Sequence, residues 1–235
     1  VHDREHRGAV GRAAIEAGAD IGLGARRIVH EARRKPSGIV ASRDAHVARG
    51  ERRGSRSGSR VAMRTLLIDN YDSFTGNLYQ LIWVVTGSAP VVIENDRADF
   101  DDVLARGVDA IVISPGPGRP DRPRDFGLSA RAILESDVPL LGVCLGHQGI
   151  CHLYGGSVTQ AGEVKHGRAS AIHHRGDELF SGILSPFLAV RYHSLLVSRI
   201  PDCLETIAWT EDDLCMAVRH RERPCLLYTS DAADE

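Results

Sequence analysis

Cys144 stands in a sequence pattern that could make its thiol a nucleophile. It lies between Gly142 and Gly146 in the run Gly-Val-Cys-Leu-Gly, directly after a stretch of apolar residues. Small residues on both sides allow the sharp strand-to-helix turn that exposes a nucleophilic side chain. The start of a helix favours the reactive thiolate, and the N–H group of Leu145 can face an oxyanion on the attacked carbonyl. The pattern alone indicates a buried structural cysteine equally well.

A second segment, Ser-Pro-Gly-Pro-Gly at residues 114–118, also follows an apolar run. Its two prolines stiffen the loop, and its glycines allow a ligand to approach the backbone closely. Because prolines have no N–H group, Gly116 and Gly118 are the possible donors after Pro115, and Gly118 can supply a second oxyanion donor. Taken alone, the segment is more typical of an ordinary tight loop.

Alternating stretches of apolar residues predict an α/β fold between Met63 and Pro224. The patterns favour strands at residues 65–69, 90–94, 109–113 and 138–143, and helices at residues 74–85, 100–105, 128–134 and 146–154. This alternation implies a mostly parallel open sheet with helices on both faces. Short extra strands are expected on one side of a mixed sheet, near Ser157 and at residues 169–174, 188–190, 206–209 and 215–218.

Polar loops follow three of the predicted parallel strands, at residues 69–73, 114–118 and 144–148. In open sheets of this kind, ligands bind beyond the carboxyl ends of the strands. We therefore expect the three loops to lie together and to form the site in which Cys144 acts.

These segments resemble those of class I glutamine amidotransferases, enzymes with a flavodoxin-like sheet and a cysteine, histidine and glutamate triad. The resemblance is carried by Gly-Val-Cys-Leu-Gly-His-Gln at 142–148, Ser-Pro-Gly-Pro-Gly at 114–118 and Asp-Asn-Tyr-Asp-Ser-Phe at 69–74, with further matches at 166–170, 191–195 and 216–220. More narrowly, the chain is similar to the glutaminase components of anthranilate synthase and of para-aminobenzoate (aminodeoxychorismate) synthase.

The resemblance implies that Cys144 attacks the side-chain amide of L-glutamine and forms a glutamyl thioester, with Leu145 and Gly118 in the oxyanion hole. It also implies a substrate site made of Gly116, Pro117, Gly118, Gln148, Ser194 and Leu195. In such enzymes Ser194 and Leu195 would hold the amino-acid head group through their backbones, and His193 would be structural. The domain itself would need no cofactor or metal, because Mg²⁺ belongs to the chorismate-binding synthase, a separate subunit or fused domain, that receives the ammonia.

The family also has a His-Pro-Glu run shortly after the strand matched at residues 216–220, and this sequence lacks it. His220, His173 and His174 match other segments and are poor substitutes for the triad histidine. We therefore expect residues 63–224 to be an amidotransferase domain that is incomplete at its carboxyl end. The 235-residue chain should have negligible glutaminase activity, and the natural continuation should supply His-Pro-Glu within about ten residues of Pro224.

The two ends of the chain differ from the rest. Residues 1–62 hold 14 basic and 7 acidic residues and no aromatic residue, whereas the remainder holds 15 basic and 24 acidic residues. Met63 is the first methionine, so residues 1–62 are expected to be a non-native or disordered basic leader. A linker from an upstream domain and a nucleic-acid-binding arm are the alternatives. Residues 225–235 resemble the translation of a transposase adapter from sequencing libraries and are expected to be foreign.

Composition also bears on the class of protein. The acidic remainder argues against a nucleic-acid surface, and no apolar run approaches the ~20 residues of a membrane span. The start of the chain lacks the apolar region of a signal peptide, and the five cysteines have no disulfide-like spacing. We expect a cytoplasmic protein.

Three alternatives stay open at this point. The chain could serve another class I branch, such as GMP, CTP, carbamoyl phosphate or imidazole glycerol phosphate synthesis, although residues 69–74 and 191–195 favour the chorismate-using branch. Within that branch, residues 172–180 and 185–192 lean toward para-aminobenzoate synthases. The domain could also be a non-catalytic binding module. A metal site is the weakest alternative, because its candidate ligands lack a second distant pair of zinc-finger type: Cys144, His147, Cys151 and His152.

Overall fold

The computed structural model describes residues 63–97, 100–105, 107–160, 168–191, 195–223 and 225–228. The predicted leader at 1–62 and most of the adapter-like tail lie outside the described residues. So do the matched residues His166, Gly167, His193 and Ser194.

Four parallel strands form one half of a nine-stranded sheet. They are β1 (Thr65–Asp69), β2 (Val91–Glu94), β3 (Ala110–Ile113) and β4 (Leu140–Val143), and they lie in the order β2-β1-β3-β4. Each begins within about two residues of the strand predicted from the sequence. Because all four are parallel, their carboxyl ends meet at one edge of the sheet.

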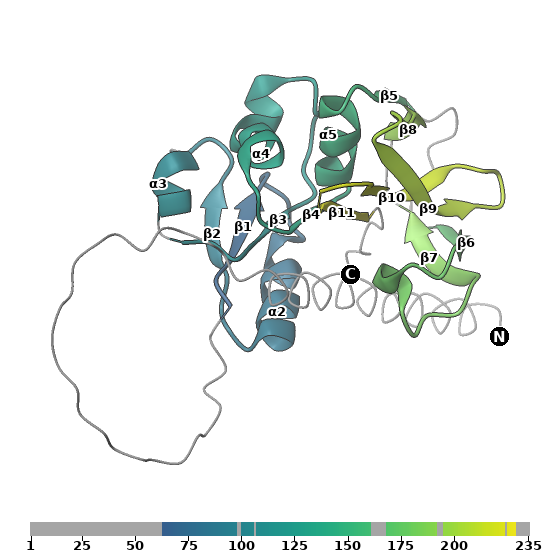
Figure 1. The fold of residues 1–235 in the computed structure, drawn as a ribbon, viewed down its shortest axis with the longest axis horizontal. Helices are drawn as coiled ribbons and strands as arrows, with labels where there is room; N and C mark the ends of the chain where they lie inside the picture. Colours follow the sequence, from purple (N-terminus) through teal and green to yellow (C-terminus); the bar gives the residue numbers. More distant parts are fainter. Residues whose placement is uncertain are drawn as a thin grey trace, which may run out of the picture.

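Helices cover both faces of this sheet, as predicted (Figure 1). Leu66 and Ile68 of β1 pack into the core beneath α3 (Phe100–Ala105), α4 (Pro123–Glu135) and α5 (Leu145–Leu153). Leu67, which points to the opposite face, packs with residues of α2 (Thr75–Thr86). Successive side chains of a strand point to opposite faces, so a wholly apolar strand must be covered twice.

Helix α4 begins five residues before the predicted helix. Pro123 occupies its first turn, and Gly127 adopts φ 33° and ψ −120°, so the regular helical pattern of apolar residues starts only after that glycine. The backbone at Gly127 approaches the carbonyl of Asn95 so closely that a Cβ atom there would overlap it. The N–H group of Leu128 donates to that same carbonyl at 2.7 Å. The kink therefore fastens α4 to the loop after β2.

The other half of the sheet is mainly antiparallel. Its strands continue in the order β11 (Cys225–Tyr228), β10 (Cys215–His220), β9 (Leu204–Thr210), β6 (Arg168–His174) and β7 (Phe187–Arg191). β11 is parallel to β4 and antiparallel to β10, so strand direction begins to alternate there. The predicted group of extra strands on one side of a mixed sheet is confirmed for β6, β7, β9 and β10.

β5 (Ser157–Gln160) is an exception to that prediction. It pairs antiparallel with β8 (Leu195–Arg199) in a separate two-stranded sheet. The local sequence pattern does not indicate β8 as a strand. Pairing across nearly forty residues depends on tertiary contacts that the local apolar pattern does not contain.

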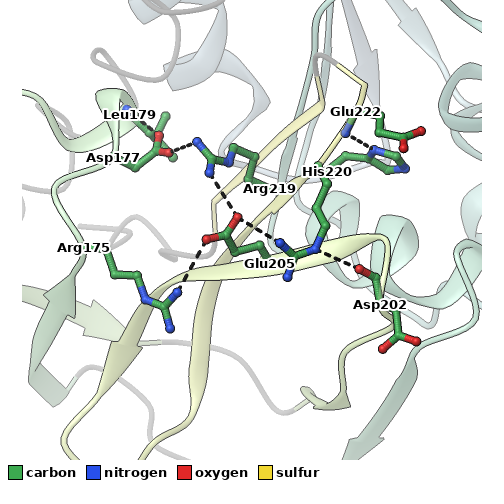
Figure 2. Close-up of polar contacts among 9 residues, drawn as sticks. Arg175, Asp177, Leu179, Asp202, Glu205, Arg219, His220 and Glu222 are labelled. Carbon is green, nitrogen blue, oxygen red and sulfur yellow. Dashed lines mark hydrogen bonds and ion pairs between the residues drawn. The ribbon is translucent and has the colours of Figure 1, made fainter.

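A short 3-10 turn at Glu178–Phe180 packs Leu179 and Phe180 against the same face of the sheet as α2. Ion pairs hold this turn, as Figure 2 shows: Arg219 contacts Asp177 at 2.5 Å and Glu205 at 3.1 Å. The side chain of Asp177 is 4% exposed, so this ion pair is screened less than a surface pair. No described helix is both long and apolar enough to cross a membrane.

Candidate active site

Cys144 sits at the junction of β4 and α5 with φ 50° and ψ −101°, a conformation that non-glycine residues rarely adopt. Such strain costs about 1–3 kcal/mol and is found mainly at functional sites. The sharp strand-to-helix turn predicted from the sequence is present. The thiol is partly buried, and part of the residue packs against the core on the α2 side.

The two neighbouring glycines are required by close backbone contacts. A Cβ atom on Gly142 would lie 2.6 Å from the carbonyl carbon of Gly146, and one on Gly146 would lie 2.9 Å from the carbonyl oxygen of Ile113. Any side chain at either position would push α5 away from the sheet. The glycines therefore let the helix begin directly above β3 and β4.

The first turn of α5 directs N–H groups to the region around Cys144. The first four N–H groups of a helix have no acceptor within the helix, and Leu145 supplies the first of them. The N–H group of Gln148 donates to the carbonyl of Cys144 at 2.9 Å and closes the turn. The helix dipole adds partial positive charge at this end, which favours a thiolate and a developing oxyanion.

The loop at residues 114–118 packs against both neighbouring loops. A Cβ atom on Gly116 would lie 2.6 Å from the carbonyl oxygen of Asn70 and 2.9 Å from Cδ2 of Leu145. Gly118 has φ 101° and lies against the carboxylate of Asp125. The predicted convergence of the loops after β1, β3 and β4 is therefore confirmed, and Leu145, Gly116 and Gly118 belong to one group of loops.

A buried amide network joins these loops. Asn70 is 2% exposed; its N–H group donates to Oγ of Ser114 and its Nδ2 to the carbonyl of Ser114, both at 2.9 Å. Its Oδ1 accepts from Nδ2 of Asn95 at 2.8 Å and from Oγ of Ser129 at 3.0 Å. Sequence reasoning missed Asn95 and Ser129. The position of Asn95 directly after β2 was the available signal, because polar residues at strand ends gather at one edge.

The segment at residues 69–74 shapes the first loop. Oδ1 of Asp69 accepts from the N–H group of Tyr71 at 2.8 Å and from Oγ1 of Thr75 at 2.7 Å. Tyr71 adopts φ 63°, and its hydroxyl donates to Asp96 at 2.6 Å. This hydrogen bond is the main reason that the pKa of Tyr71 is raised. The aspartate therefore builds a turn and places the tyrosine ring on the exposed rim.

Two of the predicted substrate-binding residues are in contact with each other. Nε2 of Gln148, which is 5% exposed, donates to the carbonyl of Leu195 at 3.4 Å. This long hydrogen bond joins the first turn of α5 to the start of β8. Pro117 lies exposed on the loop after β3, and Ser194 is outside the described residues.

Two other cysteines, Cys151 and Cys215, have buried thiols. Burial raises the pKa of the Cys151 thiol, and burial raises that of Cys215 to about 12. Both thiols stay protonated at neutral pH and are poor nucleophiles. Among the residues that the structure describes, no three His, Cys, Asp or Glu side chains are grouped to hold a metal ion.

Comparison with known proteins agrees with this geometry. Residues 66–228 match the family model for class-I glutamine amidotransferases. The chain is 51% identical over 162 residues to the aminodeoxychorismate synthase of Streptomyces griseus, a match that covers 69% of this chain and 22% of that protein. It is 48% identical over 167 residues to anthranilate synthase component 2 of Methanothermobacter thermautotrophicus, covering 68% of this chain and 85% of that protein.

The fold is also similar to solved structures. A protein of Thermoplasma acidophilum superposes with a TM-score of 0.63 at 21% identity, covering 72% of this chain and 83% of that one. A glutamine amidotransferase of Thermotoga maritima superposes with a TM-score of 0.57 at 12% identity, covering 72% of this chain and 75% of that one. At these identities the likeness concerns the fold. On the match of residues 66–228, the chain belongs to the class-I glutamine amidotransferase family.

Proposed function

We propose that this chain is the glutaminase component of a chorismate-using synthase and that Cys144 is its nucleophile. The observation that carries the proposal is the strained turn that places Cys144 at the start of α5, beside the loop at residues 114–118. The resemblance of the chain to aminodeoxychorismate synthases and to anthranilate synthase component 2 supports the kind of synthase.

The reaction would proceed in two steps. The Cys144 thiolate attacks the side-chain amide carbon of glutamine, and the oxyanion receives the N–H groups of Leu145 and Gly118. The nitrogen leaves as ammonia after it gains a proton, and a glutamyl thioester remains on the sulfur. Water then attacks the thioester and releases glutamate and the thiol. The balance is glutamine and water converted to glutamate and ammonia, with no metal or cofactor in the domain.

We further propose that glutamine lies between the loop after β3 and the start of β8. Gly116, Pro117 and Gly118 would line its side chain, and Gln148 with Ser194 and Leu195 would hold its head group. The contact between Gln148 and Leu195 supports a single site for these two residues.

The thiol proton needs a base. β11 lies beside β4, and Tyr228 pairs with Val143, the residue before Cys144. We propose that the base follows β11 in the chain, because the end of β11 lies level with the end of β4. The family has His-Pro-Glu in this part of the chain, whereas residues 229–231 of this sequence are Thr-Ser-Asp. We propose that the chain with this sequence turns over glutamine negligibly.

Ammonia release from glutamine tests the proposal. The unchanged chain should release none above background, and the variant Thr229→His/Ser230→Pro/Asp231→Glu should gain glutaminase activity. A positioned acid–base group contributes about 10²–10⁴-fold, which sets the size of the expected gain. Adding Cys144→Ser should abolish it. Activity that survives Cys144→Ser, or a normal rate from the unchanged chain, would contradict the proposal.

We also propose which chorismate-using pathway the chain serves. Identity is 51–53% to two Streptomyces aminodeoxychorismate synthases and 48% to an anthranilate synthase component, which favours para-aminobenzoate synthesis. Mixing the activated variant with the synthase portions of both kinds of relative decides between them. Glutamine should support aminodeoxychorismate formation better than anthranilate formation.

A further inference from the structure

We propose that Asp125 is a positioning residue that holds Gly118 in the conformation in which its N–H group receives the oxyanion. The inference rests on the proposed function, because the direction of this N–H group matters only if Gly118 stabilises an oxyanion formed at Cys144. Asp125 would act through the backbone of the loop at residues 114–118, without touching glutamine.

The carboxylate of Asp125 binds the peptide that follows Gly118. Its Oδ2 accepts the N–H group of Arg119 at 3.1 Å. A Cβ atom on Gly118 would overlap the same oxygen, so the carboxylate packs directly against this glycine. The side chain of Asp125 is 12% exposed, which limits competition from water for the hydrogen bond. Asp125 therefore contacts the residue that is proposed to supply the second oxyanion donor.

This hydrogen bond removes most of the freedom left in the loop. The two prolines of the loop have a fixed φ, so its backbone turns mainly at Gly116 and Gly118. Gly116 is confined by Asn70, whose carbonyl oxygen would lie 2.6 Å from a Cβ atom on that glycine. Gly118 has φ 101°, and the hydrogen bond from Arg119 to Asp125 orients the peptide plane that follows it. The conformation of Gly118 therefore depends on Asp125.

Asp125 is itself held in place from two sides. Its carbonyl accepts from Nδ2 of Asn95 at 3.0 Å, and the same nitrogen donates to Oδ1 of Asn70 at 2.8 Å. The next residue, Phe126, is 1% exposed and packs against α5 at Gly149, where a Cβ atom would overlap its ring. The amide network that binds the start of the loop at residues 114–118 thus also fixes the residue that binds its end.

The second carboxylate oxygen of Asp125 is paired separately. Oδ1 accepts from Nε of Arg124 at 3.1 Å, which leaves Oδ2 for the N–H group of Arg119. Burial favours the neutral carboxyl, but the hydrogen bonds from these two arginines lower the pKa of Asp125 overall. An ionised carboxylate accepts a stronger hydrogen bond from a backbone N–H group than a neutral acceptor does. The charge of Asp125 therefore strengthens its hold on the loop.

The test attaches a ketone to Cys144 in the chain as it stands. In a chloroketone analogue of glutamine, a –CO–CH₂Cl group replaces the side-chain amide; the thiolate displaces chloride and forms a thioether. At about pH 9 part of the thiol is ionised without a neighbouring base. Hydrogen bonds to the ketone oxygen lower its C=O stretching frequency, which infrared difference spectroscopy measures on labelled protein with and without an isotope in the ketone.

Asp125→Ala is compared with Asp121→Ala, because both aspartates bind Arg119. Asp121 accepts from Nε of the Arg119 side chain at 2.9 Å, whereas Asp125 accepts from its backbone. Asp125→Ala should shift the carbonyl band to higher wavenumber, since the N–H group of Gly118 is no longer held toward the ketone oxygen. Asp121→Ala should leave the band in place. Asp125→Asn, which keeps an acceptor oxygen at the same position, should restore most of the lowering.

Two further measurements separate positioning from a merely structural role. Alkylation of Cys144 by iodoacetamide forms no oxyanion, so its rate should be nearly the same in all these variants. Asp125→Ser covers the case in which Asp125→Ala fails to fold. Its hydroxyl suits the first turn of α4 but is too short to reach the N–H group of Arg119, so its carbonyl band should also shift.

The outcomes distinguish the inference from the proposed function. An unchanged carbonyl band in folded Asp125→Ala or Asp125→Ser would overturn the inference. An equal shift in Asp121→Ala, or an equal loss of iodoacetamide reactivity and of band lowering in Asp125→Ala, would overturn it too. A chloroketone adduct on another residue, or one on Cys144 that excess glutamine does not prevent, would overturn the proposed function and the inference with it.

Discussion

The position of Cys144 at the start of α5 depends on two nearby glycines that have no side chain. Gly142 and Gly146 have no Cβ, and that space is occupied by the backbone of α5 and by the carbonyl of Ile113. The cost of the strained Cys144 backbone is offset by the packing of α5, whose first seven residues are all buried. The strained backbone of Cys144 and the close packing at Gly142 and Gly146 are therefore parts of one strand-to-helix turn.

Gly146→Ala should destabilise the protein by about 1–3 kcal/mol, because the added methyl would overlap the carbonyl of Ile113 in a closely packed site. Gly76→Ala is the matched control. Gly76 lies in α2, nothing is within 4 Å of its Cβ position, and alanine favours the helix there. Urea unfolding measures both. Equal free energies of unfolding for the two variants would show that Gly146 is not confined as described.

The sequence revealed most of the candidate site at this scale because the residues lie in contiguous motifs. Cys144, Leu145 and Gln148 share one run, and Gly116 and Gly118 share another. Asn95 and Ser129 were missed because their contacts with Asn70 span 25 and 59 residues. Side-chain hydrogen bonds across such separations depend on the folded geometry, which no local pattern encodes.

At the scale of elements, local signals were sufficient for the parallel half of the fold. β3 and β4 are fully buried, and β1 is buried except at Asp69, so these strands appear in the sequence as short, nearly continuous apolar runs. The amino-terminal part of α4 was missed because Gly127 interrupts the helical pattern. The pairing of β5 with β8 was missed because it joins segments far apart in the chain.

The turn before β11 should make stability depend on pH. Burial, and secondly the charge of Arg223, lower the pKa of His220. The unfolded chain therefore binds a proton more readily than the folded one. The contribution of His220 is fully present above its unfolded pKa of about 6.5 and is lost as the pH falls below that value.

The free energy of unfolding in urea at pH 7.5 and pH 5 measures this effect. The unchanged chain should lose more stability on acidification than His220→Gln, which has an oxygen acceptor but does not titrate. The remaining histidines titrate in both proteins, so they cancel in the difference. Parallel losses in the two proteins would mean that the neutral His220 ring does not hold the turn.

At the scale of the whole molecule, the described residues coincide closely with the segment matched by the family model. The described part runs from residue 63 to 228 with short gaps, and the match covers residues 66–228. The matching segment makes up 85% of an anthranilate synthase component 2 but 22% of an aminodeoxychorismate synthase. The segment therefore makes up most of one relative and a minor part of the other.

The central claim is that the sulfur of Cys144 attacks glutamine. Its most direct test is to treat the Thr229→His/Ser230→Pro/Asp231→Glu variant with a diazoketone analogue of glutamine and to map the adduct by mass spectrometry. The account predicts a single adduct on Cys144 that excess glutamine prevents, with Cys151 and Cys215 unmodified because burial keeps their thiols protonated. An adduct on another residue, with Cys144 left unmodified, would contradict it.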